Sequence, residues 1–258
     1  MRTWLAAAMV AALATGVMAD TIPASGGPIE LTPMVHAHVQ IEFGGKVIQV
    51  DPTSQTNPQA PRAADLILVT DIHPDHMDAA SIERMRKPTT RFVGPPALAG
   101  RFPGETTILA NGETAVVDGI SIQAVAAYNL TRGPAAGQLY HPKGRGNAYV
   151  LTLGGKRILL TGDTECTPEL KALTGIDVAF VTMNLPFTMT PQEAADCVRA
   201  FKPAIVYAYH YRQDGLVPPE KNRTDFLLAM AGATGIDVRS ADFYPPPPGA
   251  PGIGGRGQ

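Results

Sequence analysis

Four side chains that can bind a divalent cation occur within one short segment: Asp71, His73, Asp75 and His76. Carboxylates and imidazoles at this density are costly unless something organises them. A divalent cation does so, because it neutralises the carboxylates and is bound by neutral imidazole. The segment therefore predicts a metal site, and a polar turn with solvated side chains is the alternative.

Three more candidate ligands are dispersed along the chain. His141 lies in the polar, glycine-rich segment 128–146, Asp163 follows a predicted hairpin, and His210 follows the mainly apolar run 204–209. The sequence has no Gly-x-Ser-x-Gly motif, which would indicate a serine nucleophile. If the chemistry is metal-dependent, the fold must bring these three residues to the segment that contains Asp71.

Two predicted β-hairpins precede candidate ligands. Residues 38–51 and 148–161 each place β-like runs on both sides of a Gly-Gly-Lys turn. This repeat predicts two similar halves, each with a hairpin that leads into a functional loop. The run 66–70, which is apolar up to its final threonine, delivers the chain directly to Asp71 and is typical of a buried strand.

Strands and helices are expected to alternate after the first hairpin. Strands that alternate with helices in two similar halves favour two sheets packed face to face with helices outside. The expected fold is an α/β, four-layer αββα sandwich, and residues 20–243 are expected to form one domain. Further strands are predicted over residues 177–182 and 204–209, and helices over residues 78–87, 190–201 and 221–233.

The two ends of the chain differ from this domain. Residues 1–19 combine Arg2 with an alanine-rich apolar stretch and small or apolar residues before Asp20, which is the layout of a secretory signal peptide. The stretch is shorter than the roughly 20 residues of a membrane span, although an uncleaved anchor is the alternative. We expect a periplasmic or secreted protein. Residues 244–258 are dominated by Pro and Gly and are expected to form a disordered tail.

Composition restricts the partners. The 258 residues carry a net charge of −2 and no run of basic residues, which argues against nucleic acid and, after signal cleavage, against a membrane. A small-molecule substrate is therefore expected, and the oligomeric state is not predicted. Export would permit a disulfide between Cys166 and Cys197. Their spacing in sequence does not show that they lie close in space, and we expect two free, partly buried thiols.

The segment from Asp71 to His76 resembles the metal-binding signature of the metallo-β-lactamase superfamily, which usually reads His-x-His-x-Asp-His after a buried strand. Other landmarks follow in the family's order: His-Pro-Lys-Gly at His141, Gly-Asp-Thr at Asp163, and His210 after a strand. The resemblance implies two divalent metal ions, Zn, Mn or Fe. The implied ligands are Asp71, His73 and His141 at the first position, Asp75, His76 and His210 at the second, and Asp163 between them.

Asp71 departs from this pattern, because the family usually has histidine there. An aspartate can bind a cation through oxygen, so the first position can still hold a metal ion. The extra carboxylate favours Mn or Fe, although the general affinity order favours Zn. The substitution can instead leave the first position weak or empty.

Further motifs resemble the ascorbate-6-phosphate lactonase-like branch of that superfamily, among them His-Ala-His at His36, Asp-Pro at Asp51 and Tyr-Asn at Asn129. This resemblance implies hydrolysis of a small-molecule lactone, ester or phosphodiester by a metal-activated water, with Asp75 orienting that water. The alternatives are a non-catalytic exported metal- or ligand-binding protein, which Asp71 motivates, and a β-lactamase.

Four residues outside the ligand set are candidates for supporting roles. His36 is expected to hydrogen-bond substrate or a ligand carboxylate, or to have a structural role only. Asp51 is expected to order a ligand histidine, and Asn129 to shape the pocket or satisfy a turn. Lys143 is expected to hold an anionic substrate group, with a solvated lysine as the alternative.

Overall fold

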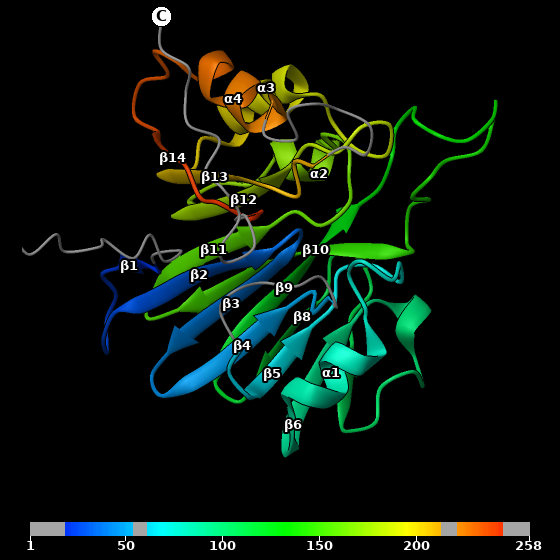
Figure 1. Ribbon diagram of the computed structural model, residues 1–258, viewed down its shortest axis with the longest axis vertical. Helices are drawn as coiled ribbons and strands as arrows, with labels where there is room; N and C mark the ends of the chain where they lie inside the picture. The colour runs from blue at the N-terminus through cyan, green and yellow to red at the C-terminus, as the bar shows by residue number, and fades with distance from the viewer. Residues whose placement is uncertain (1–18, 54–60, 213–220, 245–258) are drawn as a thin grey trace, which may run out of the picture.

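The computed structural model describes residues 19–53, 61–212 and 221–244. Two seven-stranded sheets lie face to face, with helices outside them (Figure 1). This arrangement confirms the predicted α/β sandwich. The expected signal peptide, apart from its last residue, and the expected tail after residue 244 lie outside the described residues.

The first sheet contains the strands of the first half in chain order. Its four leading strands pair antiparallel and the remaining ones pair parallel. The strands are β1 (Asp20–Ile22), β2 (Ile29–Val35), β3 (His38–Phe43), β4 (Lys46–Val50), β5 (Ala64–Leu68), β6 (Arg86–Gly94) and β7 (Thr106–Ile108).

The second sheet repeats this order. Antiparallel pairing again holds for its first four strands, and parallel pairing follows. The prediction of two similar halves, each with a glycine-turned hairpin, is therefore confirmed. The strands are β8 (Thr114–Val117), β9 (Ile120–Ala127), β10 (Gly146–Leu153), β11 (Lys156–Leu160), β12 (Val178–Thr182), β13 (Ile205–Tyr209) and β14 (Asp237–Arg239).

Strand β5 shows how the layers are built. Its Leu66 and Leu68 belong to the core shared by the two sheets, whereas Ile67 between them packs with Ile82 in a separate cluster. Successive side chains of a strand point to opposite faces, so α1 (Ala79–Met85) covers the outer face of the first sheet. The second sheet carries the other helices on its outer side (Figure 1). These are α2 (Pro168–Lys171), α3 (Pro191–Phe201) and α4 (Lys221–Ala229), and a short 3₁₀ turn, η1, spans Pro96–Leu98.

Local sequence explains where two of the helices begin. The Asp78 side chain accepts a hydrogen bond from Ser81 N at the start of α1. A capping box formed by Thr190 and Glu193, with Pro191 in the first turn, starts α3. Such caps satisfy backbone N–H groups that have no partner inside the helix.

The two cysteines form a disulfide, so the expectation of free thiols was wrong. Cys166 and Cys197 are 31 residues apart in sequence, with Cα atoms 5.6 Å apart. The bond ties the segment after Asp163 to helix α3. Closing a loop of this length stabilises a fold by roughly 3–4 kcal/mol in the chain-entropy model. Among the described residues, no helix is long and apolar enough to cross a membrane.

Candidate metal centre

The candidate ligands converge at one edge of the two sheets. Strand β5 leads into the loop from Asp71 to His76, β11 leads to Asp163, and β13 leads to His210. The carboxyl ends of parallel strands meet at the same sheet edge, which is where open α/β folds place their sites. Here they border a cavity of about 500 Å³, lined by His36, His73, Asp75, His141, Asp163, Asn184, Phe187 and Arg212.

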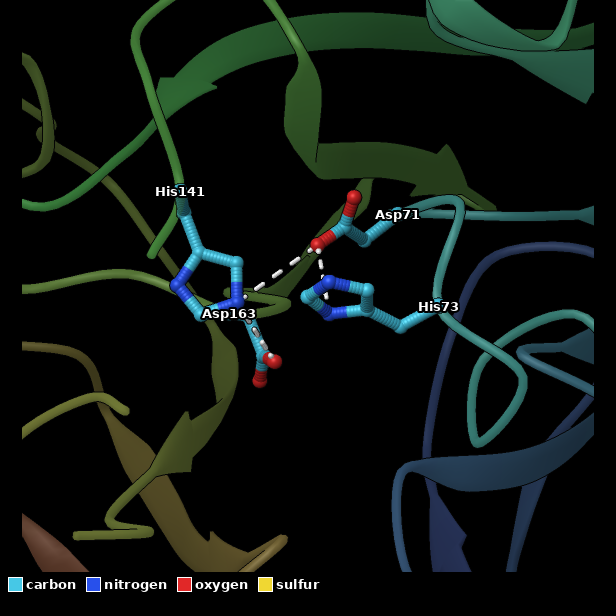
Figure 2. Close-up of side chains that lie close together, drawn as sticks. All are labelled: Asp71, His73, His141 and Asp163. Carbon is cyan, nitrogen blue, oxygen red and sulfur yellow. Dashed lines mark ion pairs between the residues drawn. The ribbon is translucent and has the colours of Figure 1, made fainter. Parts of the chain in front are cut away.

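One ligand group, which we call the first position, contains Asp71, His73, His141 and Asp163 (Figure 2). Asp71 Oδ2 lies 3.4 Å from His73 Nδ1 and 3.6 Å from His141 Nε2. His141 Nε2 lies 3.1 Å from Asp163 Oδ2. Two residues come from each half of the chain, so this group exists only where the halves meet.

The second position is formed by Asp75, His76 and His210, again with Asp163. His76 Nε2 lies 3.3 Å from Asp163 Oδ2, and His210 Nε2 lies 3.5 Å from Asp163 Oδ1. Asp75 Oδ2 lies 3.4 Å from His210 Nε2 and 3.8 Å from His76 Nε2. Asp163 thus faces both positions, as a bridging ligand would.

Asn129 fixes the orientation of the His141 ring. Its Oδ1 accepts hydrogen bonds from the backbone N of His141 at 2.8 Å and from His141 Nδ1 at 2.7 Å. Its Nδ2 donates to the backbone oxygen of Phe187 at 2.8 Å, which settles the amide orientation. His141 therefore carries its proton on Nδ1 in the neutral ring, and its Nε2 presents a lone pair to the first position.

The orientation of the His141 ring shows whether a cation fits between His141 and Asp163. The lone pair of His141 Nε2 and the Asp163 carboxylate are both acceptors, yet they face each other without a hydrogen bond. Buried Asp163 Oδ1 also has no hydrogen-bond partner. Buried acceptors in contact repel each other unless a cation lies between them. The donor set of imidazoles and carboxylates matches Zn, Mn or Fe, so the residues fit the metals that the sequence predicts.

A fully buried carboxylate supports the second position. Asp51 Oδ2 lies 2.9 Å from His76 Nδ1, and both side chains are 0% exposed. Asp51 also accepts hydrogen bonds from the backbone N and hydroxyl of Thr70 at 2.7 Å and 2.6 Å. The arrangement places Asp51 against a candidate ligand histidine, turns His76 Nε2 towards Asp163 and raises the basicity of the ring.

The electrostatics of the second position favour positive charge. Burial alone would lower the pKa of His76, but Asp163 and Asp51 raise it well above its usual value. Burial would likewise raise the pKa of Asp163, yet His76 and His210 hold it well below its usual range. The carboxylates of Asp163 and Asp51 that favour a proton on His76 would also favour a metal cation, which competes with that proton.

His36 supports Asp75 and has an unusual backbone. Its Nε2 lies 3.0 Å from Asp75 Oδ2 and its Nδ1 lies 2.7 Å from Tyr244 Oη. It adopts φ 60°, a left-handed conformation uncommon for a residue other than glycine. Burial and the nearby His210 lower the pKa of His36 to about 4. The expectation that the disordered tail begins at Tyr244 was therefore wrong for this residue, which packs against His36.

Lys143 lies outside the cavity that contains the ligands. Its Nζ is 2.5 Å from Glu169 Oε1 and 4.9 Å from the centre of the Tyr128 ring. With Glu169 it lines a different cavity, of about 430 Å³. The structure therefore does not bring Lys143 to the candidate metal ligands, unlike His36, Asp51 and Asn129.

Several residues of the site carry no motif in the sequence that marks them as functional. Arg145 donates to Asp71, and buried Glu165 accepts from Asn129 Nδ2 and from the backbone N–H groups of residues 130–132. Asn184 and Arg212 line the cavity. In sequence, each is an ordinary polar loop residue. Arg145 alone has a weak signal, because it follows His141 by four residues within the polar, glycine-rich segment 128–146.

Comparison with known proteins agrees with this geometry. A family model described as a β-lactamase superfamily domain matches residues 30–210. The chain is 33% identical over 189 residues to a UPF0173 metal-dependent hydrolase of Thermococcus onnurineus, covering 68% of this chain and 81% of that protein. It is 29% identical over 259 residues to a UPF0173 metal-dependent hydrolase of Polynucleobacter asymbioticus, covering 88% and 90%.

Solved structures show the same fold. A protein from Parabacteroides distasonis, assigned as a metal-dependent hydrolase, superposes with a TM-score of 0.78 at 33% identity, covering 89% of this chain and 100% of that one. Igni18, a metallo hydrolase of Ignicoccus hospitalis, is similar in fold alone, with a TM-score of 0.66 at 22% identity over 83% of this chain and 95% of that one. The chain therefore belongs to the metallo-β-lactamase superfamily, and it is a metal-dependent hydrolase.

Proposed function

We propose that this protein is an exported hydrolase that binds two divalent metal ions and cleaves a small-molecule lactone, ester or phosphodiester. The observation that carries the proposal is the shared carboxylate of Asp163, which faces both ligand groups and leaves buried acceptors in contact. Asp71, His73 and His141 would hold one ion, and Asp75, His76 and His210 the other. Such ions supply an activated water and polarise the oxygen of the bond to be cleaved.

Asp75 is the residue that we assign to orienting the attacking water. Its side chain is 36% exposed and lines the cavity, so it is accessible from the substrate side. Burial would raise its pKa, but hydrogen bonds from His210 and His36 lower it well below the usual range. Asp75 is therefore ionised at neutral pH and can accept a hydrogen bond from a water. His36 holds the carboxylate in place.

The wall of the cavity favours a substrate with an anionic group. The guanidinium of Arg212 lies 5.5 Å from the centre of the Tyr244 ring, and Arg212 borders the cavity together with the Asn184 amide. These groups suit a carboxylate or phosphate. Phe187, 40% exposed, supplies an apolar contact at the same cavity. The lactonase-like branch suggested by the sequence motifs remains a prediction.

Export is supported by two independent features. The layout of residues 1–19 is that of a secretory signal peptide. Cys166 and Cys197 form a disulfide, which persists mainly in oxidising compartments. We therefore propose a periplasmic or secreted location, to be tested by fractionating cells that express the full chain and sequencing the N-terminus of the mature protein.

Metal analysis followed by a substrate screen tests the proposed activity. The mature protein, reconstituted with Mn, Fe or Zn, is expected to bind about two equivalents and to hydrolyse lactones or phosphodiesters only when loaded. Lactones with and without a carboxylate or phosphate group should be compared in the same screen. Less than about 0.3 equivalents of each metal after reconstitution would exclude the proposed two-metal centre, since no activated water would then form there.

A further inference from the structure

Asp71 is the ligand that departs from the family pattern, and both of its oxygens already have donors. Oδ1 accepts a hydrogen bond from Ile72 N at 2.7 Å. Oδ2 accepts one from Arg145 Nη2, also at 2.7 Å. Oδ2 is the oxygen that faces His73 and His141. A cation at the first position would therefore bind an oxygen that a guanidinium already holds.

The close approach of two strand ends places this arginine. Asn147, at the start of β10, donates its backbone N–H to Thr70 O at 2.9 Å, immediately before Asp71. Gly146 permits the approach, because a Cβ there would lie 3.0 Å from Thr70 O and 3.8 Å from Asp71 Cγ. Arg145 is thus held beside Asp71 by the pairing of the two loops.

The pair is well shielded from solvent. The Asp71 side chain is 3% exposed and that of Arg145 is 19% exposed. Removing one partner of such a pair leaves an uncompensated charge in a poorly solvated place. The contact therefore neutralises Asp71 whenever no other cation does so, and a bound metal ion must compete with it.

We propose that Arg145 is a built-in counter-ion that weakens metal binding at the first position, so that the two positions fill at different metal concentrations. The proposal rests on the metal centre described above. At the second position the ring nitrogen of His76 that faces away from the metal contacts the anion Asp51, which makes His76 a stronger metal ligand. At the first position Asp71 is contacted by the cation Arg145, which withdraws charge from the ligand oxygen and repels the metal ion.

Arg145→Gln is the direct test, because glutamine retains a hydrogen-bond donor and removes the charge. Lys143→Gln is the matched control, since Lys143 lies in the same loop but pairs with Glu169 at the other cavity. Metal-free proteins would be dialysed against buffered concentrations of free Mn²⁺ or Zn²⁺, and bound metal counted by mass spectrometry. Calorimetric titration of the same proteins would give the affinity of each class of site.

The unmodified protein and Lys143→Gln are expected to bind one equivalent tightly and the second only at a free metal concentration about 10-fold to 100-fold higher. Arg145→Gln should bring the two affinities together by raising the weaker one about tenfold or more. Two equal sites in the unmodified protein, or weaker second binding in Arg145→Gln, would overturn the proposal. Absence of metal from every protein would instead refute the proposed two-metal centre.

Stability provides a second readout if Arg145→Gln folds poorly without metal. Its buried Asp71 charge is then unpaired, so metal should raise its melting temperature more than that of the unmodified protein. Arg145→Lys retains the charge on a more flexible side chain and should give an intermediate affinity at the first position. An Arg145→Lys protein with the affinity of Arg145→Gln would contradict a role for the charge.

Discussion

The two metal positions share Asp163 but differ in what surrounds their other ligands. At the second position His76 and His210 are 0% exposed, and anionic Asp51 lies behind His76. Each position also has one partly exposed ligand, Asp75 at 36% and His73 at 39%, but at the first position it is the cationic Arg145 that contacts Asp71. Ligand identity alone would suggest two similar sites. The groups behind the ligands instead predict one strong and one weak position.

The largest effect is expected at the residue common to both positions. Asp163→Ala removes the shared carboxylate, so both ions should be lost and hydrolysis should fall by roughly 10³-fold or more, because several kcal/mol of charge stabilisation disappear. Metal content and turnover measure this. Asp196→Ala, on the exposed surface of α3, is the control and should change neither. Normal turnover of purified Asp163→Ala would remove Asp163 from its bridging role.

Asp51→Asn should weaken the second position alone. The loss of charge behind His76 is expected to lower metal affinity there by about 10-fold to 100-fold, and would make the two positions more alike. The matched control is Asp118→Asn, because Asp118 has a similar backbone, with φ 51° against 50° for Asp51, but pairs with Lys46 on the surface. Equal losses at both positions would show that Asp51 acts on the whole fold.

Asn129→Ala addresses the first position. Without the Oδ1 acceptor the His141 ring is free to turn, and affinity at the first position should fall by about tenfold while the second changes little. Asn129→Asp retains the acceptor for His141 Nδ1 and should largely restore binding. If Asn129→Asp is as weak as Asn129→Ala, the hydrogen bonds that Asn129 Nδ2 donates to Phe187 O and Glu165 Oε1 matter more than the orientation of His141.

Asp71→His should have the smallest effect on total binding. It restores the ligand usual in the family, so metal remains bound and preference should shift from Mn or Fe towards Zn by a factor below about ten. Arg145 then has no carboxylate partner in Asp71, so the variant is best compared with and without Arg145→Gln. Competition between Zn²⁺ and Mn²⁺ measures the shift. Loss of all metal from Asp71→His would place Asp71 outside the ligand set.

The elements were predictable because their signals are local. Glycine-turned hairpins and the apolar run before Asp71 each lie within a few residues, and the family's order of motifs linked the distant ligands. Two findings depended on the approach of distant segments and had no local signal. One is the contact of Arg145 with Asp71, which the pairing of Asn147 with Thr70 imposes. The other is the bond between Cys166 and Cys197.

The duplicated strand order has a consequence for how the protein responds to chelators. Neither half of the chain has a complete ligand set: one provides the residues from Asp71 to His76, and the other provides His141, Asp163 and His210. Each bound ion would therefore clamp one sheet to the other at their common edge. Metal removal should first loosen the contact between the two sheets at this edge. Amide hydrogen exchange should then rise in the loops after β5, β11 and β13 before it rises within the strands.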